Sequence, residues 1–197
     1  AFGSGAGLMV IGNLASIVKD QIGLPALSAI AISALALGNG GGRILYGMLS
    51  DKIGRRTVLL VAFLWQALLI SFLFFLDANS ILSNGVVLLV FVALIGANYG
   101  ANLAVFPAMT KDYFGPKHLA INYGIVYTAW GLGGFMVSQL ASLIKDSYGT
   151  FDLAYLLAAG MLILAAVMMF FMKSPQEAIF DASSGERELD VALASAD

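Results

Sequence analysis

Long runs of apolar residues constrain this chain more than any other feature of its sequence. Several of these runs lack the polar positions that recur every 3.6 residues on the helices of soluble bundles. A helix rises 1.5 Å per residue, so roughly 20 residues cross the ~30 Å of hydrocarbon in a bilayer. The pattern therefore predicts an all-α membrane protein with six transmembrane helices, at about residues 1–18, 26–49, 57–76, 85–108, 119–144 and 153–172.

Composition supports this class, because 60% of the residues are hydrophobic and only 11% are charged. Soluble domains carry about 25% charged residues. The chain begins with Ala1, and its first run would span only ~27 Å as a helix, so we expect a piece of a longer chain with a truncated first helix. Residues 1–172 then form one transmembrane domain, and the acidic residues 173–197 form a disordered tail.

The second run carries an unusual charge, Arg43, inside its apolar stretch. An arginine at this depth costs roughly 2.5–3.5 kcal/mol on insertion scales, so a solvated cavity or a bound anion is expected to compensate it. Asn39 lies one helical turn earlier on the same face. A side chain that extends to the membrane surface is the alternative, since the run ends near Leu49; the depth of Arg43 favours the cavity.

A charged turn follows this run and carries a recognisable pattern. From Gly47 to Arg56 it reads G-x-x-x-D-[RK]-x-G-[RK]-[RK], and every position is filled. This pattern is typical of the cytoplasmic loop between the second and third helices of each half of major facilitator superfamily transporters. Within that superfamily, the chain resembles the oxalate/formate antiporter family over most of residues 8–172, most clearly in the segments 7–21, 38–56 and 121–134.

The resemblance implies a specific architecture. The six runs would be helices seven to twelve of a twelve-helix fold, which is one half built from inverted three-plus-three repeats. The partner would be the amino-terminal six-helix half, and transport would proceed by alternating access. The loop motif, comprising Gly47, Asp51, Lys52, Gly54, Arg55 and Arg56, would gate cytoplasmic closure, and Asp51 is expected to pair with a nearby arginine.

Basic residues predict the orientation, because cytoplasmic loops carry an excess of Lys and Arg. Only Lys19 and Lys145 fall on the side opposite the 50–56 turn. The side of that turn collects seven basic residues, namely Lys52, Arg55, Arg56, Lys111, Lys117, Lys173 and Arg187. We therefore expect this side, with the carboxyl terminus, to be cytoplasmic and the protein to lie in the inner (plasma) membrane.

Arg43 leads the candidate substrate-binding residues. The resemblance implies that an arginine in the eighth helix binds the substrate carboxylate, and a guanidinium can hold it through two parallel hydrogen bonds. Asn39 would bind substrate or position Arg43, or would instead form an interhelical hydrogen bond. The fourth and fifth runs add polar and aromatic residues at helical spacing, for which bundle packing is the alternative role: Asn98, Tyr99, Asn102, Phe106, Tyr123, Tyr127 and Trp130.

One departure from the family pattern bears on the substrate. Oxalate-exchanging members carry a lysine in the eleventh helix, within Y-x-x-Y-[ST]-A-K-G, where this chain has Trp130. A single fixed cation favours a monocarboxylate such as lactate, pyruvate, formate or acetate. All twelve Asp and Glu residues lie outside the six runs, so this half brings no intramembrane proton relay, and exchange or facilitated diffusion stays open.

Other functions find little support in the sequence. Gly38 to Gly42 lacks the strand and spacing of a nucleotide-binding loop and is expected to pack helices closely. His118 is the single histidine, and there is no cysteine, so no metal site or cofactor is expected. We expect a transporter of a small organic anion rather than an enzyme, with no nucleic-acid partner. Oxalate/formate-type dicarboxylate exchange and a non-transporting membrane sensor or scaffold are the alternatives.

Overall fold

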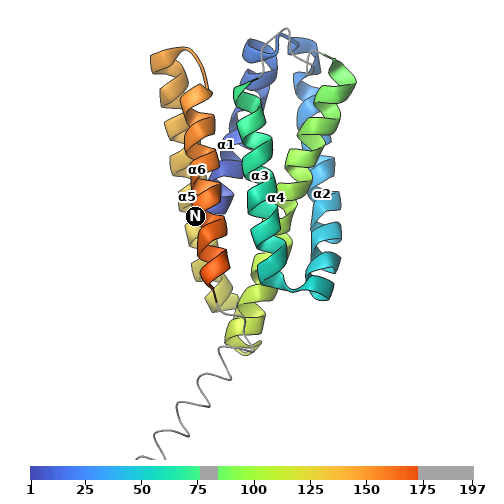
Figure 1. Cartoon of the computed structure of the whole chain (residues 1–197), viewed down its shortest axis with the longest axis vertical. Coiled ribbons are helices and arrows are strands. Elements are labelled where there is room, and N and C mark those ends of the chain that lie inside the picture. Colours follow the sequence, from blue (N-terminus) through green and yellow to red (C-terminus); the bar gives the residue numbers. More distant parts are fainter. Residues whose placement is uncertain (76–83, 173–197) are drawn as a thin grey trace, which may run out of the picture.

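The computed structural model describes residues 1–75 and 84–172, and all the regular structure in these ranges is helical. Six α-helices stand side by side (Figure 1). The expected tail at 173–197 and the end of the third run lie outside the described residues. The elements are α1 (Phe2–Ser16), a π-helical turn (Ile17–Gln21), a 3₁₀ turn (Pro25–Leu27), α2 (Ser28–Ile53), α3 (Arg55–Phe74), α4 (Gly85–Phe114), α5 (Leu119–Tyr148) and α6 (Asp152–Phe171).

Four candidate membrane spans stand out among the described residues by their length and apolar composition. They are Phe2–Asp20, Arg55–Phe74, Gly85–Phe114 and Asp152–Phe171. The helices α2 and α5 are 26 and 30 residues long but more polar. Helix α2 carries Asn39, Arg43 and a run of glycines, and α5 carries several amide and hydroxyl side chains. The structure thus describes an all-helical membrane protein whose two most polar long helices hold most of the predicted site.

The polar connections are much shorter than the sequence predicted. The turn expected over 50–56 is wrong in extent, because α2 continues to Ile53 and α3 begins at Arg55. Gly54 alone separates them, with φ 90° and ψ 147°. Residues other than glycine rarely adopt a positive φ. Glycine at position 54 therefore allows a single residue to reverse the chain.

The same error recurs at the other connections. The expected connection over 109–118 shrinks to four residues because α4 extends to Phe114, and α5 extends past 145 to Tyr148. Residues 19–21, expected in a connection, belong instead to the π-helical turn Ile17–Gln21. The physical reason is that polar side chains mark where a helix leaves the hydrocarbon, whereas a helix ends where its backbone turns.

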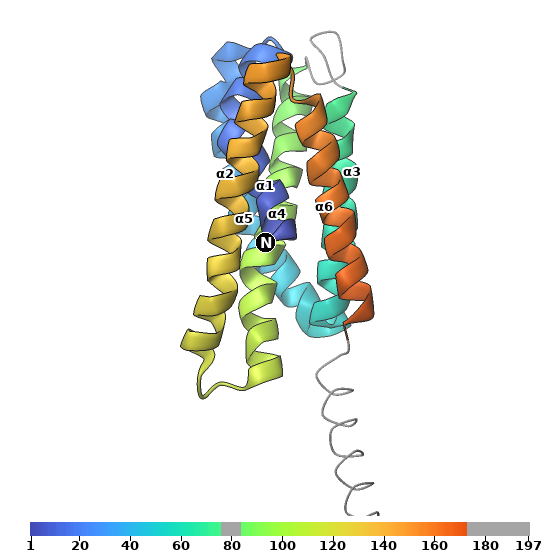
Figure 2. The same ribbon diagram turned by 90° about the vertical axis from the view of Figure 1, so that its left-hand side faces the viewer.

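The helices associate mainly in pairs that are not consecutive in sequence. Helix α2 packs along α4, α3 along α6 and α1 along α5, and Figure 2 shows α1 lying between α5 and α4. Large side chains such as Met9, Leu59, Ile70 and Leu162 are fully buried between these pairs. Ala1 lies part of the way along the bundle (Figures 1 and 2), next to the residues that form the candidate site.

Glycines bring α2 and α4 into backbone contact. A Cβ atom added at Gly42 would lie 2.5 Å from the Cα and carbonyl carbon of Ala97, and one at Gly100 would lie 2.5 Å from the carbonyl oxygen of Asn39. Gly38 meets Ala93 in the same way. The prediction that this glycine run packs helices closely is therefore confirmed for Gly38 and Gly42. An added Cβ at position 40 or 41 would meet nothing within 4 Å among the described residues.

Candidate functional site

Arg43 is exposed on α2 and is oriented by its neighbour one turn earlier. Its Nε donates a hydrogen bond of 3.1 Å to Oδ1 of Asn39. Asn39 lies toward the start of α2, so this bond directs the side chain away from the nearer end of the helix at Ile53. A snorkelling arginine would extend in the opposite direction. Within residues 1–75 and 84–172, no carboxylate forms an ion pair with Arg43.

Aromatic side chains from α4 and α5 contact one another. Trp130 donates from Nε1 to the hydroxyl of Tyr99 at 2.7 Å. The ring of Trp130 stacks on Tyr127, with centroids 4.6 Å apart and 16° between the planes. Tyr123 follows at 5.7 Å from Tyr127. The structure therefore brings these four predicted aromatics into one cluster.

A cavity of about 290 Å³ lies against this cluster. Polar groups on its wall come from three helices: Ser4 of α1, Asn102 of α4 and the tips of the α5 aromatics. The remaining wall is apolar, and carboxylates are absent from its described lining. The lining residues are Ala1, Ser4, Asn102, Leu103, Phe106, Tyr123, Ile125, Val126, Tyr127, Ala129 and Trp130.

Asn98 lies outside this cavity, although the sequence placed it on one face with Asn102 and Phe106. It is 2% exposed. Its Oδ1 accepts from the hydroxyl of Tyr46 at 2.8 Å, and its Nδ2 donates to Ala62 O at 2.7 Å and to Gln66 Oε1 at 2.8 Å. Asn98 thus joins α2, α3 and α4, and both of its amide N–H groups are already donated.

Tyr99 is also buried, at 2% exposure, and is absent from the cavity lining. Its ring packs where a Cβ at Gly7 would stand, and its hydroxyl faces Trp130. Tyr99 therefore supports the cavity wall from behind. Asn102, by contrast, is 5% exposed and lines the cavity.

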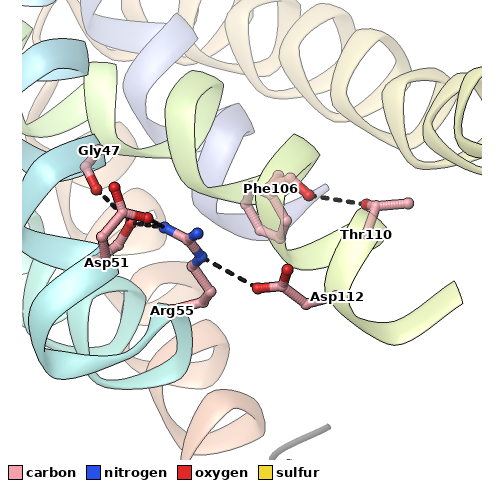
Figure 3. A network of polar contacts seen from close by, with 7 residues as sticks. Gly47, Asp51, Arg55, Phe106, Thr110 and Asp112 are labelled. Carbon is pink, nitrogen blue, oxygen red and sulfur yellow. Dashed lines mark hydrogen bonds and ion pairs between the residues drawn. The ribbon is translucent and has the colours of Figure 1, made fainter. Parts of the chain in front are cut away.

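The loop motif forms a polar network at the end of the bundle where α2 meets α3 (Figure 3). Arg55 lies at its centre: Nη1 contacts Asp51 Oδ1 and Ser50 Oγ, each at 2.5 Å, and Nε contacts Asp112 Oδ2 at 3.2 Å. Ser50 donates in turn to the carbonyl of Gly47 at 2.7 Å. The expected pairing of Asp51 with a nearby arginine is confirmed, and Asp112 ties α4 to the motif.

Arg56 binds a different helix. Its Nε donates to the carbonyl oxygen of Met169 at 3.0 Å, and Nη2 donates to that of Phe170. The last carbonyls of a helix have no partner within it, so a basic side chain can satisfy them. Arg56 therefore caps the end of α6. Among the described residues no such contact is made by the side chain of Lys52, and Gly54 reverses the chain.

Several residues of these networks were missed by the sequence reasoning. Asp112 and Gln66 carried no distinguishing pattern, and Ser4 is one small residue among glycines. Tyr46 offered a weak signal, because it lies three residues after Arg43 on the same helix. Their roles depend on which helix lies opposite, and the apolar runs alone do not specify that.

The superfamily follows from comparison with known sequences. The sequence profile of the Major Facilitator Superfamily matches residues 1–195, and the chain belongs to that superfamily, which confirms the resemblance. It is 32% identical over 129 residues to "Uncharacterized MFS-type transporter YhjX" of Escherichia coli (strain K12), covering 65% of this chain and 31% of that protein. It is 28% identical over 167 residues to "Oxalate:formate antiporter" of Oxalobacter formigenes, covering 84% of this chain and 38% of that protein.

Relatives with other names are almost as similar. "Sialic acid transporter NanX" of Escherichia coli (strain K12) is 28% identical over 149 residues, covering 74% of this chain and 35% of the relative. The chain thus spans about a third of the length of the curated relatives it matches. These names agree on membrane transport rather than enzymatic activity and differ in the substrate.

Proposed function

We propose that this chain is the carboxyl-terminal six-helix half of a secondary transporter for a small organic anion, a monocarboxylate of the lactate, pyruvate or formate type. The observation that carries the proposal is Arg43, a guanidinium that Asn39 holds and that has no carboxylate partner in the described structure; neither residue is among those that line the cavity. An anion bound to Arg43 would offset the cost of placing the cation in a membrane.

The cavity favours a small substrate with one carboxylate. At about 290 Å³ it lies just below the ~300–1,000 Å³ of sites for drug-sized ligands. Trp130 occupies the position where oxalate-exchanging relatives carry a lysine, so this half presents a single cation. The named oxalate:formate antiporter keeps dicarboxylate exchange as the second candidate, and the missing second cation counts against it.

The proposed topology places six spans in the plasma membrane. The motif network and the α4–α5 connection lie at one end of the bundle, joined by Arg55 and Asp112. The pair of Lys145 and Asp20 lies between α5 and the end of α1. Because basic residues concentrate at the motif end, we assign that end, and the carboxyl terminus beyond α6, to the cytoplasm. The partner is an amino-terminal half that completes the site, and the two halves rock about it.

Substitution of Arg43 in the full-length transporter, reconstituted in proteoliposomes, tests the proposal. Arg43→Lys retains the charge but not the two-pronged geometry, so carboxylate binding should weaken by ~1–3 kcal/mol. Arg43→Gln should abolish saturable uptake while the protein still inserts and folds. Lys117→Gln, which removes an exposed positive charge from the α4–α5 connection, is the matched control and should transport normally.

Two results would contradict the proposal. Monodisperse Arg43→Gln protein that transports carboxylates at the parent rate would remove Arg43 from the site. A parent protein that binds carboxylates but moves none across the bilayer would instead support the sensor or scaffold alternative.

A further inference from the structure

Asn102 has an unusual hydrogen-bonding state. Its Nδ2 donates to the carbonyl oxygen of Tyr99 at 3.4 Å. Its Oδ1 is buried, and no donor among the described residues reaches it. The amide orientation follows from chemistry, because a carbonyl oxygen only accepts hydrogen bonds and so must face the NH₂ group. The side chain therefore carries an unsatisfied acceptor.

An unpartnered buried acceptor is costly, which makes its position informative. Asn102 lines the cavity beside Tyr127 and Trp130, and the side chain is 5% exposed. The torsion that turns an asparagine amide is broad and soft, so the amide can adjust to a donor presented from the cavity. A ligand that offers a donor at this wall would satisfy the oxygen.

We propose that Asn102 selects monocarboxylates that carry a hydroxyl group, the 2-hydroxy acids being the smallest of them. The inference rests on the proposed function, in which the carboxylate pairs with Arg43. The hydroxyl then donates to Oδ1 of Asn102, a residue of the cavity lining. Trp130 cannot compete for that oxygen, because its Nε1–H is already donated to Tyr99 at 2.7 Å.

Three acids of similar size test this selectivity. Lactate carries a hydroxyl donor, propionate carries no group at that position, and pyruvate carries only an acceptor. In the full-length transporter in proteoliposomes, lactate should compete for uptake about tenfold more strongly than propionate, which corresponds to ~1.4 kcal/mol. Pyruvate should be no stronger than propionate, because its oxo group would meet Oδ1 without a proton between them.

The variant Asn102→Leu is close in size and removes the acceptor. The lactate-to-propionate ratio should collapse to about one, and the folded yield should be retained because Asn102 contributes one long hydrogen bond. Asn98→Leu is the matched control one turn earlier on α4. It deprives Tyr46 and Gln66 of their partner, so it should reduce folded yield but leave the ratio unchanged.

The outcomes separate this inference from the function on which it rests. If the three acids are taken up in an Arg43-dependent manner with equal affinity, the selectivity of Asn102 is refuted. A preference for lactate over propionate that persists in the Asn102→Leu variant also refutes the proposed role of Asn102. Uptake of none of the three acids, or uptake that Arg43→Gln leaves intact, refutes the proposed function itself.

Discussion

The close contact between α2 and α4 makes a sharp prediction about two neighbouring glycines. A Cβ at Gly42 would lie 2.5 Å from two backbone atoms of Ala97, whereas ordinary contacts begin at 3.4 Å. The carbonyl oxygen of Ala97 would be closer still, so the helices would have to separate by more than 0.9 Å at this point, because a backbone cannot move aside as a side chain can. Overpacking of this kind costs roughly 1–3 kcal/mol.

The adjacent Gly41 provides the control. An added Cβ there would meet nothing within 4 Å, so Gly41→Ala should gain only the ~1 kcal/mol of helix propensity that alanine has over glycine. Gly42→Ala gains the same propensity but loses ~3 kcal/mol to the clash, since its obstacle is backbone. The two variants should therefore differ by ~3 kcal/mol in unfolding free energy, or roughly 6–12 °C in melting temperature.

Thermal unfolding of the 197-residue chain in detergent, followed by size-exclusion chromatography of the remaining monomer, measures this difference. The parent should melt between the two variants. Equal melting temperatures for Gly41→Ala and Gly42→Ala would refute the backbone contact between α2 and α4. That result would also refute the relative placement of Arg43 on α2 and Asn102 on α4.

Two further predictions concern transport. Asp51→Asn weakens one of the two carboxylate contacts of Arg55, so it should slow flux and leave substrate affinity nearly unchanged. Initial transport rates across a series of substrate concentrations check this. An equally large loss of substrate affinity would place Asp51 in another role. Trp130→Lys removes the hydrogen bond to Tyr99 and adds a second cation, so it should strengthen oxalate binding at the expense of monocarboxylates. Competition assays check the second prediction, and unchanged selectivity in folded protein would remove Trp130 from the pocket.

The apolar runs predicted the helices well, because hydrophobic length is a direct requirement of the bilayer. They predicted helix ends poorly. Residues 50–52 and 55–56 are polar, yet they are helical, and the chain reverses at Gly54 alone. Gly54, within the charged motif, could have indicated where α2 ends. The polar residues around it instead suggested a longer turn.

The sequence predicted which residues belong to the candidate site better than it predicted how they are arranged. Asn98 and Asn102 are four residues apart, and each such step turns ~40° around the helix. That rotation places Asn98 against α3 and Asn102 against the cavity. The hydrogen bond between Trp130 and Tyr99 likewise depends on how α4 and α5 pack. Spacing within one helix contains no information about either partner.

The capping of α6 by Arg56 also has a consequence for biosynthesis. Arg56 emerges from the ribosome before its acceptors at Met169 and Phe170, which are made 113 and 114 residues later. Until then its guanidinium has only water or lipid headgroups to bind at the membrane surface. The cap closes when the last helix arrives, so it joins the start of α3 to the last helix only once the whole bundle has been inserted. A chain interrupted before α6 would leave this arginine without its carbonyl partners, as a mark of incomplete assembly.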